Sequence, residues 1–201
     1  MSIADRVRID NVQLLSENWG RLKKTTFAYR RNDGEWQTQT RETYDRGDGC
    51  TILLYNLATR TVVLTRQFRL PAFVKGHDDL MIETPAGLLD QATPEDGIRR
   101  ETEEETGYRI GKVRKVFEAF MSPGSVTERL HFFVAEYAQA DRISQGGGLA
   151  HEGEEIDILE PSIDEALAMV SAGRIVDAKT IMLLQHAALT VFAPSIGPAA
   201  K

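Results

Sequence analysis

The sequence predicts an α/β fold of the α+β type, in which a mixed sheet is packed between helices and follows a strand-rich N-terminal arm. Strand patterns come first, one helix interrupts them, further strands follow and two helices close the chain. This order differs from the regular strand–helix alternation of a doubly wound parallel sheet. The chain has 201 residues, of which 42% are hydrophobic and 27% charged. That length and composition are typical of a globular protein with a sizeable core.

The N-terminal arm is predicted from three extended segments. Residues 8–31 alternate loosely and are rich in Val, Leu, Thr, Phe and Tyr, which indicates two strands. Residues 32–34 read Asn-Asp-Gly, a strong turn signal, and 36–44 alternate again. We therefore expect residues 1–45 to form a dimerisation arm and residues 46–201 to form the main domain.

The main domain is predicted from short apolar runs separated by turns. Strands are expected at residues 50–55, 61–66, 81–84, 112–119 and 130–137. Helices are expected from about residue 94, from the capping box at Ser162 to Gly173, and over 178–191. Residues 144–153 contain Gly146–Gly148 and lack periodicity, so a mobile loop is expected there.

Charge and cysteine content exclude several classes of protein. Lys and Arg number 24 against 30 Asp and Glu, a net charge of -6, so binding to nucleic acid or to an anionic membrane is not expected. The longest nearly apolar stretch, residues 187–194, is too short to span a membrane, and the charged N-terminus does not resemble a secretory signal. The single Cys50 allows no internal disulfide. We expect a cytoplasmic protein.

The helix that begins near residue 94 is the most informative segment. Thr93 is a suitable N-cap and Gly107 a suitable terminator. Between them, Glu101, Glu104 and Glu105 stand at i, i+3 and i+4 and so share one face, where like charges destabilise a helix by a few tenths of a kcal/mol per pair. A solvated acidic surface is one interpretation. Three carboxylates beside a glycine-containing loop are also ligands that suit Mg²⁺ or Mn²⁺.

This segment resembles the signature box of the Nudix hydrolases, which cleave nucleoside diphosphates linked to another group. Gly87 matches the first glycine of the box, and residues 100–108 (Arg-Glu-Thr-Glu-Glu-Glu-Thr-Gly-Tyr) match its end. The box departs from the pattern in two places. Thr93 stands where the family has its first Glu, with spacing one residue short, and Thr102 replaces an aliphatic residue.

Further segments resemble the nucleoside diphosphate sugar branch of that family. They are residues 41–47, 66–69, 121–124, Glu128 and 177–180. The short box with Leu88-Leu89-Asp90, the Gly146–Gly148 loop and residues 177–180 are most similar to the type that acts on GDP-mannose. The resemblance implies Mg²⁺-dependent hydrolysis of GDP-mannose to GMP and mannose 1-phosphate. Hydrolysis of ADP-ribose to AMP and ribose 5-phosphate is an alternative, as are a non-catalytic nucleotide-sugar-binding module and a plain scaffold domain.

The resemblance also implies roles for individual residues. Metal ligands would be Ala86 through its carbonyl, Glu101, Glu105 and Glu154. Glu104 would be a catalytic residue, as a further ligand or through contact with metal-bound water. Glu154, next to Glu155 and ahead of an aliphatic strand, is our choice for the catalytic residue of the glycine-rich loop, with Glu152 as its rival.

The substrate-binding candidates are less specific, because each could also be a surface or packing residue. Arg69 and Arg41 are the leading phosphate ligands, and Lys179 would contact the nucleotide diphosphate. The full set is Trp19, Arg41, Glu42, Arg69, Gly87, Glu128 and Lys179. We also expect a homodimer, because an arm of this length has too little core to stand alone, and docking across a two-fold axis would cover its edges.

Overall fold

The computed structural model describes residues 2–89 and 92–193, and their contacts divide the chain into two compact units. We call the first the arm unit, which comprises Met1–Asp48 and Phe120–Leu130. The second, the main unit, comprises Gly49–Ala119 and His131–Lys201. Asp90, part of the segment compared with the family box, lies outside the described residues.

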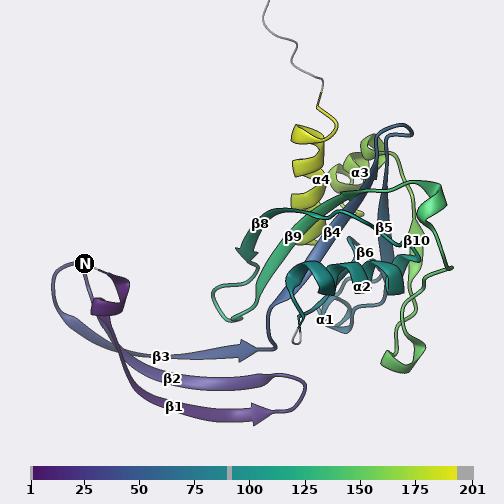
Figure 1. Ribbon diagram of the computed structural model, residues 1–201. Coiled ribbons are helices and arrows are strands. Elements are labelled where there is room, and N and C mark those ends of the chain that lie inside the picture. Colours follow the sequence, from purple (N-terminus) through teal and green to yellow (C-terminus); the bar gives the residue numbers. More distant parts are fainter. Residues whose placement is uncertain (1, 90–91, 194–201) are drawn as a thin grey trace, which may run out of the picture. The chain divides into compact units, whose positions relative to one another are not determined.

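The arm unit contains a three-stranded antiparallel sheet in the order β1-β2-β3. Its strands are β1 (Val7–Glu17), β2 (Arg21–Arg30) and β3 (Trp36–Asp45), and a 3-10 turn at Ile3–Arg6 precedes them (Figure 1). The turn between β2 and β3 places Gly34 at φ +91°, a conformation that suits glycine. Ala28 is the only buried residue of these strands. The expected strands and turn are confirmed, and the sheet has little core of its own.

The end of β3 is hydrogen-bonded to the segment Phe120–Leu130, which explains why that segment belongs to the arm unit. The Tyr44 N–H donates to the Ser125 carbonyl at 2.8 Å, and the Thr127 N–H donates to the Tyr44 carbonyl at 3.0 Å. The expected boundary between residues 45 and 46 takes no account of this segment and stays a prediction.

The main unit is built on a seven-stranded sheet ordered β10-β5-β4-β9-β8, with β6 paired to β5 and β7 to β4. Its strands are β4 (Gly49–Asn56), β5 (Thr61–Gln67), β6 (Met81–Glu83), β7 (Ala86–Leu88), β8 (Arg114–Phe120), β9 (Arg129–Glu136) and β10 (Asp157–Leu159). Strands β4, β6 and β10 run antiparallel to β5. Four consecutive β4 residues, 51–54, are fully buried, so both faces of this strand are covered.

Helices cover the two faces of this sheet. Helix α2 (Pro94–Thr106) lies on one side, and α3 (Ile163–Ser171) and α4 (Ala178–Thr190) lie on the other (Figure 1). A short helix α1 (Leu70–Phe73) follows β5. The prediction of an α+β protein with its sheet between helices is confirmed. No helix in the described part of the chain is long and apolar enough to cross a membrane.

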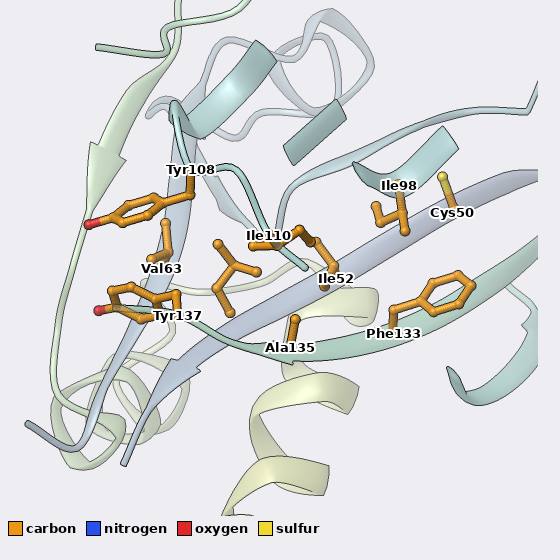
Figure 2. Close-up of a cluster of buried hydrophobic side chains, with 10 residues drawn as sticks. Cys50, Ile52, Val63, Ile98, Tyr108, Ile110, Phe133, Ala135 and Tyr137 are labelled. Carbon is orange, nitrogen blue, oxygen red and sulfur yellow. The ribbon is translucent and has the colours of Figure 1, made fainter. Parts of the chain in front are cut away.

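The apolar core lies between α2 and the sheet. Figure 2 shows Ile98 of α2 with Cys50, Ile52 and Phe133 of the strands, and all four side chains are fully buried. Within α2, Gly97 allows close packing, because a Cβ at this position would come within 2.9 Å of the Leu89 side chain. The first half of α2 is therefore anchored to the sheet, and its acidic second half is held beside β7.

The glycine-rich loop is hydrogen-bonded to the end of α2, and the mobility that we expected of residues 144–153 stays a prediction. Its Gly147 N–H donates to the Glu105 carbonyl at 2.9 Å, and its Gly148 N–H donates to the Glu104 carbonyl at 3.2 Å. Gly146, Gly147 and Gly148 have φ values of +67°, +105° and +79°. These left-handed conformations let the loop satisfy carbonyls at the end of α2 that have no partner within the helix. The lack of sequence periodicity therefore reflects a helix cap.

Candidate functional site

The acidic end of α2 packs directly against β7. Glu105 is only 2% exposed, and its Oε2 accepts a hydrogen bond from the Ala86 N–H at 3.2 Å. Glu101 lies against Gly87, where an added Cβ would come within 2.1 Å of the Glu101 carboxyl carbon. A glycine at position 87 thus leaves room for the Glu101 carboxylate, which would have to move if a larger residue stood there.

Glu154 approaches the same helix from the glycine-rich loop. Its Oε2 accepts the Leu149 N–H at 2.9 Å, and a Cβ on Gly148 would come within 2.6 Å of that oxygen. The loop carries Glu154 close enough for its charge to act on Glu101 and Glu105. The side chain of its rival, Glu152, lies outside what the structure describes. This proximity supports the choice of Glu154, whose role stays a prediction.

The electrostatics of the site are dominated by negative charge. Burial raises the pKa of Glu105 well above its usual value, and the charges of Glu101 and Glu154 raise it further. The Ala86 N–H and the Arg69 charge lower it only in part. Burial likewise raises the pKa of Glu101, Arg100 lowers it in part, and the charges of Glu104 and Glu154 add to the rise. The positive charge near the cluster therefore balances only part of the negative charge of its carboxylates.

Such a cluster has the chemistry of a divalent-cation site, because carboxylate oxygens are hard ligands. Within residues 2–89 and 92–193, however, no three His, Cys, Asp or Glu side chains stand arranged to hold a metal ion. The carboxylates have separate partners instead: Glu101 accepts from Arg100 at 3.1 Å, Glu105 from Ala86 and Glu154 from Leu149. The residues fit a cation in type, charge and proximity, and they would have to turn toward one another to bind it together.

The structure also describes the contacts of two other predicted residues of this site, Glu104 and Ala86. Glu104 is half-buried, and its side chain lines a surface hollow with Arg99 and Arg100, although its charge still acts on Glu101. Ala86 uses its N–H to bind Glu105, whereas we expected its carbonyl to bind metal. The metal-ligand roles of both residues stay predictions.

Arg69 and Lys179, two predicted phosphate ligands, are brought together by a residue that the sequence analysis missed. Glu83, at the end of β6, accepts the Arg69 Nε–H at 2.8 Å and a Lys179 Nζ–H at 2.8 Å. Lys179 also lies 3.1 Å from the Asp177 carboxylate, which caps α4 through the Thr180 N–H. In the sequence, Glu83 is marked only as a charged residue at the end of a short strand whose other residues are Met81 and Ile82.

A buried chain of hydroxyl groups fixes α4 beside this pair. The Thr84 N–H donates to the Thr180 Oγ1 at 2.7 Å, and the Thr180 hydroxyl donates to Asp177 at 2.6 Å. The Thr84 hydroxyl is 2.8 Å from that of Thr51 on β4. The first turn of α4, which carries Lys179, is thus tied to the sheet.

The remaining substrate-binding candidates belong to the arm unit, whereas the residues described above belong to the main unit. Trp19 is 75% exposed and has the Arg46 guanidinium over its ring at 5.1 Å. Arg41 donates to the Thr40 carbonyl at 2.8 Å, and Glu42 pairs across the sheet with Lys24. Glu128 accepts a hydrogen bond from Arg46 Nε at 3.2 Å. Their part in the site stays a prediction.

Comparison with known families matches both parts of the chain. Residues 6–44 match a model described as the GDP-mannose pyrophosphatase NudK N-terminal domain. Residues 45–184 match the NUDIX domain model.

Curated bacterial proteins are similar over most of the chain. A GDP-mannose pyrophosphatase of Pectobacterium atrosepticum is 56% identical over 176 residues, which are 87% of this chain and 90% of that protein. One from Yersinia pestis is 51% identical over 195 residues, or 96% of this chain and 98% of that protein. One from Klebsiella pneumoniae is 53% identical over 175 residues, or 87% of each.

Proposed function

We propose that this chain, which belongs to the Nudix hydrolase family, hydrolyses the diphosphate linkage of GDP-mannose and releases GMP and mannose 1-phosphate. The family assignment made from the sequence is confirmed by the NUDIX match over residues 45–184. The named substrate of the similar proteins supports the choice of GDP-mannose. The observation that carries the proposal is the cluster of Glu101, Glu105 and Glu154, whose negative charge is only partly balanced and which lies beside β7 and the glycine-rich loop.

Magnesium is the cation that we propose for this cluster, with Mn²⁺ as a possible substitute. Glu101, Glu105 and Glu154 would hold it. When bound, a divalent ion neutralises charge on the non-bridging phosphate oxygens and lowers the pKa of a bound water. Its affinity and its effect on the rate are measurable by calorimetry and by titration of activity with either metal.

The chain's own residues would carry out the remaining steps. Arg69 and Lys179 bind the diphosphate through charge-assisted hydrogen bonds, which orient the phosphorus for attack by water. Glu154 takes the proton of that water through its carboxylate. The bond between phosphorus and the bridging oxygen then breaks, and both products leave as phosphomonoesters. The glycine-rich loop, bonded to the end of α2, keeps Glu154 near the carboxylates of that helix.

A substrate panel with product identification tests this function. Purified protein is incubated with GDP-mannose, ADP-ribose and other nucleoside diphosphate sugars, with Mg²⁺, with Mn²⁺ and with a chelator. We expect GMP and mannose 1-phosphate as the preferred products, and no turnover with the chelator. Preferred release of AMP and ribose 5-phosphate would instead establish the ADP-ribose alternative. Tight binding of nucleotide sugars without turnover would indicate a binding module.

We further propose that the enzyme acts in the cytoplasm. Cys50 is the chain's single cysteine, and its thiol is fully buried. A chain with one cysteine allows no internal disulfide, which is typical of proteins of a reducing compartment. Cell fractionation with an antibody against the chain would test the location.

A homodimer is the assembly that we propose. In the arm sheet, Ile9, Val12 and Leu14 of β1 are 55%, 54% and 49% exposed, and no strand of the arm buries more than one residue. A second copy that covers this sheet would remove apolar surface from water. In this arrangement Trp19 or Arg41 would serve the partner's site.

Mixing two inactive variants tests the shared site. Glu105→Gln and Arg41→Ala subunits are combined under conditions in which exchange of subunits is shown independently. We expect part of the activity to return, because one site of each mixed dimer would contain both intact groups. No recovery after proven exchange would show that the arm serves its own chain.

A further inference from the structure

Glu83 is a buried charged residue at the end of β6, and its carboxylate contacts two cations that the strand itself does not need. It is 5% exposed, and each of its carboxylate oxygens accepts a different cation, Arg69 on Oε2 and Lys179 on Oε1, both at 2.8 Å. The two cations come from distant parts of the chain, 14 and 96 residues away from Glu83. One buried carboxylate thus brings together two positive groups that would otherwise repel each other.

Arg69 keeps capacity for a ligand, whereas the Lys179 side chain is 12% exposed and its Nζ, which has three hydrogens, already contacts Glu83 and Asp177. In the described residues, Arg69 uses only its Nε in hydrogen bonds, so its terminal nitrogens remain available, and its side chain is 42% exposed. Along the chain, Glu83 is followed by Thr84, Pro85 and then Ala86, whose N–H binds the Glu105 carboxylate. The cation pair and the acidic end of α2 are therefore supported by one short segment.

We propose that Glu83 is a positioning residue, which holds Arg69 and Lys179 at a set spacing as one binding site for the diphosphate of the substrate. The inference rests on the proposed function and deepens it. Glu83 itself touches neither the phosphates nor the reacting atoms. It fixes the direction in which two flexible, charged side chains present their donors, and such orientation is worth large factors in rate.

Charge alone would give the opposite result when Glu83 is neutralised. Glu83 and Asp177 balance Arg69 and Lys179, so the four groups together are neutral. Replacement of Glu83 by Gln leaves one positive charge in excess, which favours a polyanion. A fall in catalytic efficiency on neutralisation would therefore show lost positioning rather than lost attraction.

A double-mutant cycle tests this role. Glu83→Gln is compared with Lys179→Ala and with the double variant, by kcat and KM for GDP-mannose. We expect kcat/KM of Glu83→Gln to fall by about 100-fold, as for a misplaced binding group. The double variant should lose less than the product of the two single losses, because the part of the effect of Glu83 that acts through Lys179 is already gone in Lys179→Ala, while the part that acts through Arg69 remains. If the loss of kcat/KM in the double variant equals the product of the two single losses, the proposal is overturned.

Glu160→Gln is the matched control. Glu160 is also a carboxylate that accepts two hydrogen bonds, from the Tyr108 hydroxyl at 2.5 Å and from Gln139 at 2.7 Å, and it has no part in the proposed site. We expect this control to keep its activity, and an equal loss in both variants would overturn the proposal. If Glu83→Gln does not fold, Glu83→Asp replaces it. Its shorter side chain cannot reach both cations, so the same loss is expected.

Binding of inorganic pyrophosphate separates this inference from the proposed function. If the wild-type chain does not hydrolyse GDP-mannose, the proposed function fails, and the same cycle is measured by calorimetric titration with pyrophosphate. Weaker binding by Glu83→Gln, again non-additive with Lys179→Ala, would support the positioning role. Unchanged binding by Glu83→Gln, or no measurable binding by the wild-type chain, would overturn it.

Discussion

Glu105 and Glu83 are both buried carboxylates of the main unit, 2% and 5% exposed. Glu83 has a cation on each oxygen, whereas Glu105 has the Ala86 N–H and two acidic neighbours whose charges raise its pKa. A buried charge without a partner destabilises a fold more than a buried charge that is paired. Of the two, the Glu105 cluster is the region whose charge is less well balanced, which is consistent with the cation site that we propose there. Glu83 organises the adjacent cations.

The largest expected effect is that of neutralising the unmatched carboxylate. Glu105→Gln should lower turnover by at least about 100-fold, because a charged metal ligand is lost. The fold should persist, and the metal-free protein should become slightly more stable, since repulsion from Glu101 and Glu154 is relieved. Circular dichroism, thermal unfolding and a rate assay measure these effects together. Near-normal turnover in the folded variant would remove Glu105 from the site.

The next effect concerns the loop carboxylate near this cluster. Glu154→Gln should slow turnover by about ten- to 100-fold and weaken substrate binding much less, as expected of a residue that acts on the water. Glu152→Gln is the comparison and should do little. Steady-state kinetics give both parameters. A sensitive Glu152 with a silent Glu154 would mean that the loop register is wrong.

A smaller loss is expected when the support of Glu101 is disturbed. Gly87→Ala would place a methyl group 2.1 Å from the Glu101 carboxyl carbon, so the carboxylate must move. We expect a loss of about tenfold in turnover, since displacement of a metal ligand misplaces the reacting groups, which is costly even over short distances. Gly111→Ala is the control, because nothing lies within 4 Å of a Cβ built there. Equal activity of both variants would show that the position of Glu101 is not critical.

The smallest effect is a pH dependence of stability without metal. Because the folded pKa of Glu105 is raised above 4.5, the folded state binds more protons than the unfolded state in the range above that value. The stability contributed by the protonated group is present below pH 4.5 and is lost as the pH rises through the folded pKa. A tenfold difference in proton affinity between the folded and unfolded states corresponds to about 1.4 kcal/mol of this stability.

Thermal unfolding with a chelator measures this dependence. The wild-type protein should lose more stability than Glu105→Gln as the pH rises above 4.5, and Mg²⁺ should restore stability to the wild type. The same pH profile in both proteins would show that Glu105 is not the group that titrates.

Local signals predicted much of the structure. The alternation of residues 8–31 and 36–44 and the turn between them correspond to β1, β2 and β3. Thr93 caps α2 through the Asp96 N–H, and Gly107 ends it at φ +75°. These features depend on neighbours within one turn of helix or one strand pair, so the sequence pattern contains them.

Features formed by distant residues were not predictable in this way. Residues 70–73 and 86–88 form α1 and β7, which are too short to show periodicity. The three glycines were interpreted as a mobile loop, because the helix end that they cap lies some 40 residues earlier in the chain. Their conformations suit a left-handed cap, but the carbonyls to be capped can only be identified in the folded chain.

By itself, the sequence determined the α+β class, the acidic face of α2 and membership of the Nudix hydrolase family. Only the tertiary structure decided that Glu105 is buried, that Gly87 makes room for Glu101, and that Glu83 joins Arg69 to Lys179. The reason is physical. Helix periodicity and capping arise from hydrogen bonds between near neighbours, whereas burial and ion pairing depend on which strands and helices the topology places together.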